Sequence, residues 1–99
     1  MDGVRILRPE TLALARTCLA SGLDADFGQS YAFGVGFMLQ TAVADLGPAP
    51  DAFGHSGYGG SLHGAWPSRR LGFSYAMNEA RSDKERPHAL LAALEAVTR

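Results

Sequence analysis

Residues 53–78, which read FGHSGYGGSLHGAWPSRRLGFSYAMN, decide the fold of this 99-residue chain. Large and small side chains alternate through the last part of this stretch, residues 71–78, and a period of two predicts a β-strand. Two shorter runs, 53–57 and 61–66, predict two further strands. The link at 67–70 has the length of a hairpin connection, so we expect the strands on either side of it to be antiparallel neighbours.

Upstream of this stretch, residues 31–39 also alternate, and they predict another strand with a buried face formed by Phe33, Val35, Phe37 and Leu39. Residues 24–30 and 45–51 are rich in polar residues, glycine or proline and predict connecting loops.

Helices are predicted at both ends of the sheet. Pro9 and Glu10 suit a helix start, apolar residues then recur at helical spacing, and Gly22 offers a left-handed stop, which together predict a helix over 9–20. Pro87 and the apolar stripe after it predict a second helix over 87–97. The expected class is therefore α+β: a single unit, 1–99, with an antiparallel sheet of three to four strands flanked by an N-terminal and a C-terminal helix.

Composition narrows the partners and the chemistry. Hydrophobic residues make up 46% of the chain, charged residues 19%, and the formal net charge is −1, which favours a globular unit and predicts neither nucleic acid nor a membrane as a partner. The N-terminus lacks the pattern of a signal peptide, so the chain is assigned to the cytoplasm by default. Cys18, the single cysteine, is expected to be a small core hydrophobe, and Lys84, the single lysine, to lie in a solvated loop over 81–86.

Five of the twelve glycines fall between Gly54 and Gly64. Such a cluster marks either a tight hairpin corner or a place where a ligand approaches the backbone, and spacing alone leaves both open. The nucleophile elbow and the dinucleotide fingerprint fail here, because Tyr58 and Leu62 stand where each motif needs glycine. The spacing of the three histidines fits no named metal site, so neither a metal nor a cofactor is expected.

Residues 53–78 as a whole resemble the C-terminal segment of the serine β-lactamase-like hydrolases, the superfamily of class C β-lactamases, penicillin-binding carboxypeptidases and related esterases. In that family a Lys-Thr-Gly or His-Thr/Ser-Gly triplet lies on a strand beside the active site, before a glycine pair and a proline-containing hairpin. Here the triplet is His55-Ser56-Gly57, the pair is Gly59-Gly60 and the hairpin begins at Pro67. The similarity extends upstream through residues 31–37, and it implies a partial β-lactamase/transpeptidase-like fold.

The resemblance also implies roles for four residues. The backbone N–H of Tyr58, just after the triplet, would be one of two oxyanion-hole donors in acyl transfer. Ser56 and Gly57 would contact the substrate through a hydroxyl and a close backbone approach, and His55 would bind substrate where β-lactamases usually carry lysine. Because histidine is a weaker cation than lysine, ester substrates become more plausible relative to β-lactams.

The family's nucleophile lies in Ser-x-x-Lys, and a Tyr-x-Asn element assists proton transfer. This chain has no serine three residues before its lysine, and Tyr75 lies three residues, not two, before Asn78. We therefore expect a C-terminal portion of a serine hydrolase, of carboxylesterase or β-lactamase type, that is inactive alone and takes a small ester or amide substrate in the full-length context. The alternative is a free-standing binding or self-association module derived from that fold, which associates through exposed sheet surface.

Overall fold

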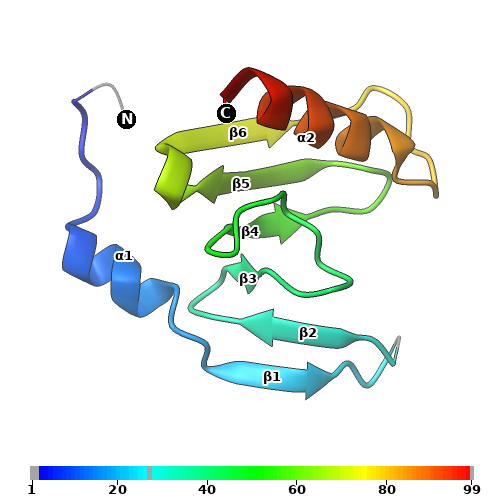
Figure 1. The fold of residues 1–99 in the computed structure, drawn as a ribbon. Helices are drawn as coiled ribbons and strands as arrows, with labels where there is room; N and C mark the ends of the chain where they lie inside the picture. The colour runs from blue at the N-terminus through cyan, green and yellow to red at the C-terminus, as the bar shows by residue number, and fades with distance from the viewer. Residues whose placement is uncertain (1–2, 27, 99) are drawn as a thin grey trace.

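The computed structural model describes residues 3–26 and 28–98, and its central feature is a six-stranded antiparallel sheet in which every strand pairs with its neighbour in sequence (Figure 1). The elements are α1 (Pro9–Ala15), β1 (Ala20–Leu23), β2 (Ser30–Phe33), β3 (Met38–Leu39), β4 (Phe53–Ser56), β5 (Leu62–Trp66), a 3-10 turn η1 (Pro67–Arg69), β6 (Leu71–Tyr75) and α2 (Glu85–Thr98). The α+β class, the antiparallel sheet and the two helices are confirmed, but the predicted number of strands was too low.

The predicted single strand over 31–39 is wrong, because these residues form a hairpin. β2 ends at Phe33, the amide of Gly34 donates to the carbonyl of Phe37 at 2.9 Å, and β3 returns antiparallel with Met38 opposite Phe33. Gly36 has φ +76, a conformation that glycine adopts at little cost. Val35, expected on a buried face, lies at the turn with 62% of its surface exposed. An alternating pattern that is continuous in sequence therefore spans two paired strands.

The predicted helix over 9–20 is too long. α1 ends at Ala15, and Ala20–Leu23 instead form β1, which pairs with β2 from Ala20 opposite Phe33 to Leu23 opposite Ser30. Thr17 and Cys18 are weaker helix formers than the alanines and leucines before them, and the sheet offers the following residues a full set of backbone partners. Gly22 is a strand residue with φ +143 rather than a helix stop. Cys18 is exposed, so its assignment to the core is also wrong.

The core lies between the sheet and α2, which covers β5 and β6 (Figure 1). Trp66 on β5 has no exposed surface, and its indole Nε1 donates to the carbonyl of Leu46 at 2.7 Å. An added Cβ on Gly47 would lie 2.3 Å from that indole, so only glycine fits beside the ring. Leu91 of α2 closes the same cluster from the helix side. Trp66 therefore anchors β5, α2 and the 46–47 loop in one packed unit.

The downstream elements agree with their predicted positions, with shifted ends. β6 stops at Tyr75 rather than residue 78, and α2 begins two residues earlier than predicted. A 3-10 turn fills the predicted hairpin link, and Arg70 after it has φ 52. Among the described residues, no helix is long and apolar enough to cross a membrane.

Candidate functional site

The end of β4 forms an open edge within the sheet. β4 pairs with β5 along its whole length, from Phe53 to Ser56. On its other side the two-residue strand β3 reaches only Phe53 and Gly54. The edge of β4 at His55 and Ser56 is therefore free of β3, and main-chain groups at such an edge can bind an extended ligand.

The turn after β4 fixes the direction of one backbone N–H group. The amide of Gly57 donates to the carbonyl of Ser61 across the hairpin at 2.9 Å, and the amide of Gly60 donates to the carbonyl of Gly57 at 3.4 Å. The Gly57 carbonyl and the Tyr58 N–H belong to one trans peptide unit, so they point in opposite directions. Within residues 3–26 and 28–98 the Tyr58 N–H has no hydrogen-bond acceptor.

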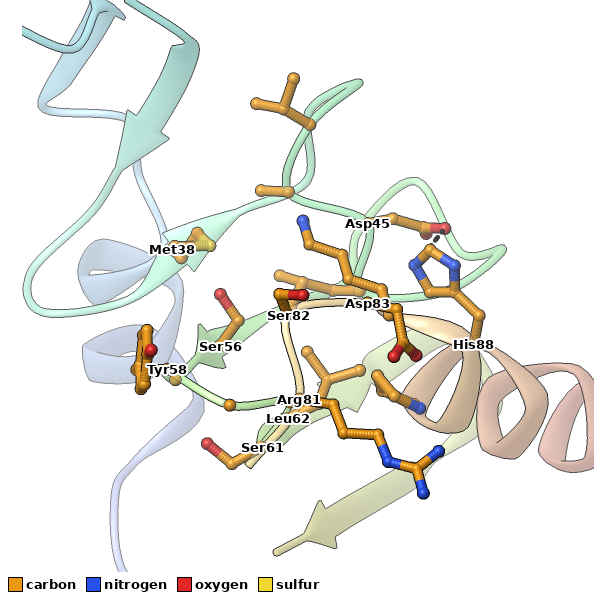
Figure 2. A pocket seen from close by; sticks show the side chains of 18 residues that line it. Met38, Asp45, Ser56, Tyr58, Ser61, Leu62, Arg81, Ser82, Asp83 and His88 are labelled. Carbon is orange, nitrogen blue, oxygen red and sulfur yellow. Dashed lines mark ion pairs between the residues drawn. The ribbon is translucent and has the colours of Figure 1, made fainter. Parts of the chain in front are cut away.

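A pocket of about 260 Å³ lies beside this open edge (Figure 2). One wall comes from Met38 of β3 and the loop after it, a second from the end of β4 and the glycine-rich turn, and a third from the segment before α2. The pocket brings together three of the four predicted site residues, Ser56, Gly57 and Tyr58, whereas His55 does not line it. Tyr58 is 98% exposed, so its side chain is not packed against the rest of the described chain.

His55 lies on the opposite face of β4 from Ser56, because successive side chains of a strand alternate. Its ring centroid is 6.2 Å from that of Phe33, and its Nδ1 lies 2.5 Å from the carbonyl oxygen of Ser56. Directly across the sheet is His63 on β5, whose Nδ1 is 2.7 Å from the hydroxyl of Ser74. Both imidazoles are exposed, and each has a polar partner from the sheet.

Three charged residues that were predicted to lie in a solvated loop, Arg81, Asp83 and Lys84, also line the pocket. His88, in the first turn of α2, lines it beside them. The His88 Nε2 lies 3.9 Å from a carboxylate oxygen of Asp45 on the facing loop, and this pair joins two pocket walls (Figure 2). The charge run gave no sign of this position, because only the tertiary fold brings it against the glycine-rich turn. Among the described residues, no three histidine, cysteine or acidic side chains are grouped so that they could hold a metal.

Gly59 and the facing pair Gly54 and Gly64 have steric reasons to be glycine. Gly59 is buried with φ +89, and an added Cβ would lie 2.8 Å from Ala80 Cβ and from Met77 Cε. Gly54 faces Gly64 across β4 and β5, and a Cβ on Gly54 would come within 2.6 Å of the Gly64 Cα. The cluster therefore includes a close contact of the turn with the 77–80 segment as well as a tight strand pair.

Comparison with known proteins places this arrangement in a family. The profile of the family described as Beta-lactamase matches residues 1–98. No curated protein sequence matches the chain significantly. A family VIII carboxylesterase of known structure is 35% identical, with a TM-score of 0.87 over 97% of this chain. A penicillin-binding protein homologue from Caulobacter crescentus is 34% identical, with a TM-score of 0.73 over 81%.

The chain spans 27% of the length of the carboxylesterase and 22% of the length of the penicillin-binding protein homologue. The family match covers almost the whole chain, and each of the two solved structures is identical to it at just over a third of the aligned residues. These findings confirm the resemblance drawn from residues 53–78, and this chain belongs to the beta-lactamase family.

Proposed function

We propose that this chain forms one wall of the catalytic cleft of a serine hydrolase that cleaves carboxylic esters through an acyl-enzyme, and that the Tyr58 backbone N–H is one of its oxyanion donors. The observation that carries the proposal is the Tyr58 amide itself. It has no acceptor among the described residues, it follows the open edge of β4, and Tyr58 lines the pocket. A fixed, unpaired N–H is the kind of group that stabilises negative charge developing on a carbonyl oxygen.

The neighbouring residues would hold the substrate. Ser56 lines the pocket, and its hydroxyl has no hydrogen-bond partner among the described residues, so it can bind a substrate carbonyl. Gly57 is exposed and lines the pocket beside it, so its backbone is accessible to a ligand. His55 would contact the substrate from the other face of the open edge, where its exposed ring lies at the end of β4. The carboxylesterase matches 97% of this chain with a TM-score of 0.87, against 81% and 0.73 for the penicillin-binding protein homologue, and this closer structural match supports an ester as the substrate.

The nucleophile would come from outside these 99 residues. The sequence contains one lysine, Lys84, and the residue three positions before it is Arg81, so no Ser-x-x-Lys element is present. Ser56 has no base within hydrogen-bonding distance among the described residues, which argues against a nucleophilic role for it. We therefore propose that the chain binds and polarises the substrate while a nucleophile-bearing region completes the reaction.

A self-association module is the second candidate, favoured by the apolar surface of the N-terminal third. α1 buries none of its residues, and the burial pattern of the edge strand β1 is exposed throughout. β1 carries neither charge nor proline, the features that usually protect a free edge from pairing with another chain. The same surface would serve the hydrolase by packing against the nucleophile-bearing region.

The test uses a chimaeric esterase, in which this chain replaces the matching 27% of the family VIII carboxylesterase. Tyr58→Pro removes the N–H without breaking an internal hydrogen bond, and Tyr58→Ala removes the side chain but keeps the N–H. With p-nitrophenyl acetate, we expect Tyr58→Pro to lower kcat by about 100-fold or more, as for loss of an oxyanion donor. Tyr58→Ala should stay within about threefold of the parent, because the donor remains.

The result that would contradict the proposal is equal activity of the proline and alanine variants. A chimaera with no activity would contradict it as well, because the wall would then fail to support the reaction. A chromogenic cephalosporin assayed in parallel separates the substrate classes, and turnover of the ester in preference to the cephalosporin is expected.

A further inference from the structure

Arg86, in the first turn of α2, bridges two segments beside the glycine-rich turn. Its Nη2 donates to the backbone carbonyl of Glu79 at 2.6 Å. The same nitrogen lies 3.9 Å from the position that a Cβ on Gly60 would occupy, which places the guanidinium against the turn. Arg86 is half-buried and does not line the pocket, unlike Arg81 and Lys84. Arg86 therefore lies behind the residues that line the pocket.

The segment that Arg86 holds is itself bonded to the turn. The amide of Arg81 donates to the carbonyl of Gly59 at 3.0 Å. Ala80 and Met77 pack so closely on Gly59 that no Cβ would fit there. Gly59 follows Tyr58 directly, so the 79–81 segment restrains the backbone on one side of the Tyr58 N–H. On the other side, the restraint is the pairing of Gly57 with Ser61.

The first turn of α2, which carries Arg86, is held in place by packing. Pro87 is buried next to Arg86, and Leu91 one turn further along α2 belongs to the Trp66 core. A cation that donates to a carbonyl in a fixed geometry is among the stronger hydrogen bonds of proteins. The packed core is thus connected to the turn through α2, the Arg86 guanidinium, the Glu79 carbonyl and the Arg81 amide.

We propose that Arg86 is a positioning residue that holds the Tyr58 N–H in the direction required of an oxyanion donor, acting through Glu79, Arg81 and Gly59. This inference rests on the proposed function. Arg86 does not line the pocket, so no direct contact with the substrate is proposed for it. Its loss should therefore disturb the transition state, in which the oxyanion exists, far more than the binding of the neutral ester.

The first test uses the 99-residue chain and follows amide hydrogen exchange by NMR. Arg86→Ala should speed exchange of the Arg81 amide by about tenfold, because a charge-assisted hydrogen bond that closes its segment is lost. The resonance of the Tyr58 amide should shift in the same variant. Arg86→Lys keeps a cationic donor and should recover most of both effects. Arg8→Ala, at an exposed arginine just before α1, is the matched control and should change neither.

The second test measures kinetics in the chimaeric esterase. Arg86→Ala should lower kcat by about tenfold and leave KM within about twofold, and Arg86→Lys should restore most of kcat. A loss that appears in KM rather than kcat would overturn the positioning role. Unchanged exchange of the Arg81 amide in the first test would overturn it too, whatever the kinetics show.

The two proposals fail in different ways. If Tyr58→Pro lowers kcat strongly and Arg86→Ala does not, the positioning role is wrong and the oxyanion donor stands. If Arg86→Ala loosens the Arg81 amide but Tyr58→Pro leaves kcat unchanged, the bridge exists but the proposed function is wrong.

Discussion

The N-terminal segment, residues 3–26 and 28–37, and the core segment, residues 38–98, differ sharply in how they are held. Among the described residues, every buried hydrophobic side chain lies in the core segment (Met38, Ala44, Leu46, Ala49, Ala52, Phe53, Leu62, Trp66, Leu91). Most of the large hydrophobic side chains that are exposed lie in the N-terminal segment (Val4, Ile6, Leu7, Leu14, Leu19, Leu23, Val35). The chain therefore joins a self-packed unit to a segment whose apolar side chains find little cover within it.

Within the N-terminal segment the elements are joined by backbone hydrogen bonds, whereas ring contacts of Arg16 and Phe37 with Phe53 connect the segment to the core segment. β1 pairs with β2 over four residues, and the amide of Val35 donates to the carbonyl of Ala15 at the end of α1 at 2.8 Å. An added Cβ on Gly34 would lie 2.1 Å from the same carbonyl, so α1 approaches the β2–β3 turn closely. Backbone pairing fixes the geometry of the segment, but the hydrophobic term that stabilises the core segment is largely missing from it.

The strongest test of this difference is Trp66→Ala. The substitution opens a cavity at a site with no exposed surface and leaves the Leu46 carbonyl without its indole donor. We expect a loss of about 3–5 kcal/mol in the free energy of unfolding, measured by urea denaturation. For a unit of this size that loss is a large part of the total stability.

Leu14→Ala on α1 is the matched control, since it also shortens a large apolar side chain. Because Leu14 is 71% exposed, the free energy of unfolding of this variant should differ from that of the parent by less than about 0.5 kcal/mol. Similar losses of unfolding free energy in Trp66→Ala and Leu14→Ala would show that both segments share one core, and the proposed difference between them would be wrong.

A smaller effect on stability, but a clear effect on association, is expected when the N-terminal apolar surface is made polar. The triple variant Leu14→Gln, Leu19→Gln and Leu23→Gln should remain folded and shift toward the monomer in analytical ultracentrifugation, because large exposed apolar patches drive association. Val97→Gln changes an equally exposed side chain on α2 and should leave the distribution unaltered. Loss of association in the Val97 variant alone would place the contact surface on the core segment.

Sequence patterns predicted the core segment better than the N-terminal segment, for the same physical reason. In β4 to β6 and α2 the pattern of apolar residues reflects actual burial around Trp66, so the predicted strands, hairpin and helix are found close to their predicted positions. In the N-terminal segment the apolar residues are mostly exposed, and periodicity misled: residues 31–39 read as one strand, and the residues after Ala15 read as helix. Backbone pairing, which leaves no period in the sequence, decides the structure there.

The candidate site was predictable only in part. The triplet His55-Ser56-Gly57 and the following Tyr58 stand out as a motif, and three of these four residues line the pocket. His55 lies on the opposite face of β4 from Ser56 because side chains alternate along a strand, and this could have been predicted from the sequence. The pocket wall formed by residues 81–84 and the bridge from Arg86 were not, because neither a charge run nor an arginine at a helix start indicates which loop it will face.

The most direct test of the central claim, that this chain supplies the oxyanion wall but not the nucleophile, is the rate of p-nitrophenyl acetate hydrolysis by the purified 99-residue chain beside the chimaeric esterase. We expect turnover by the chimaera, no turnover above buffer by the chain alone, and no change in the rate of the chain alone on Ser56→Ala. Robust turnover by the chain alone that Ser56→Ala abolishes would show that the chain carries its own nucleophile, Ser56, and does not depend on another region for it.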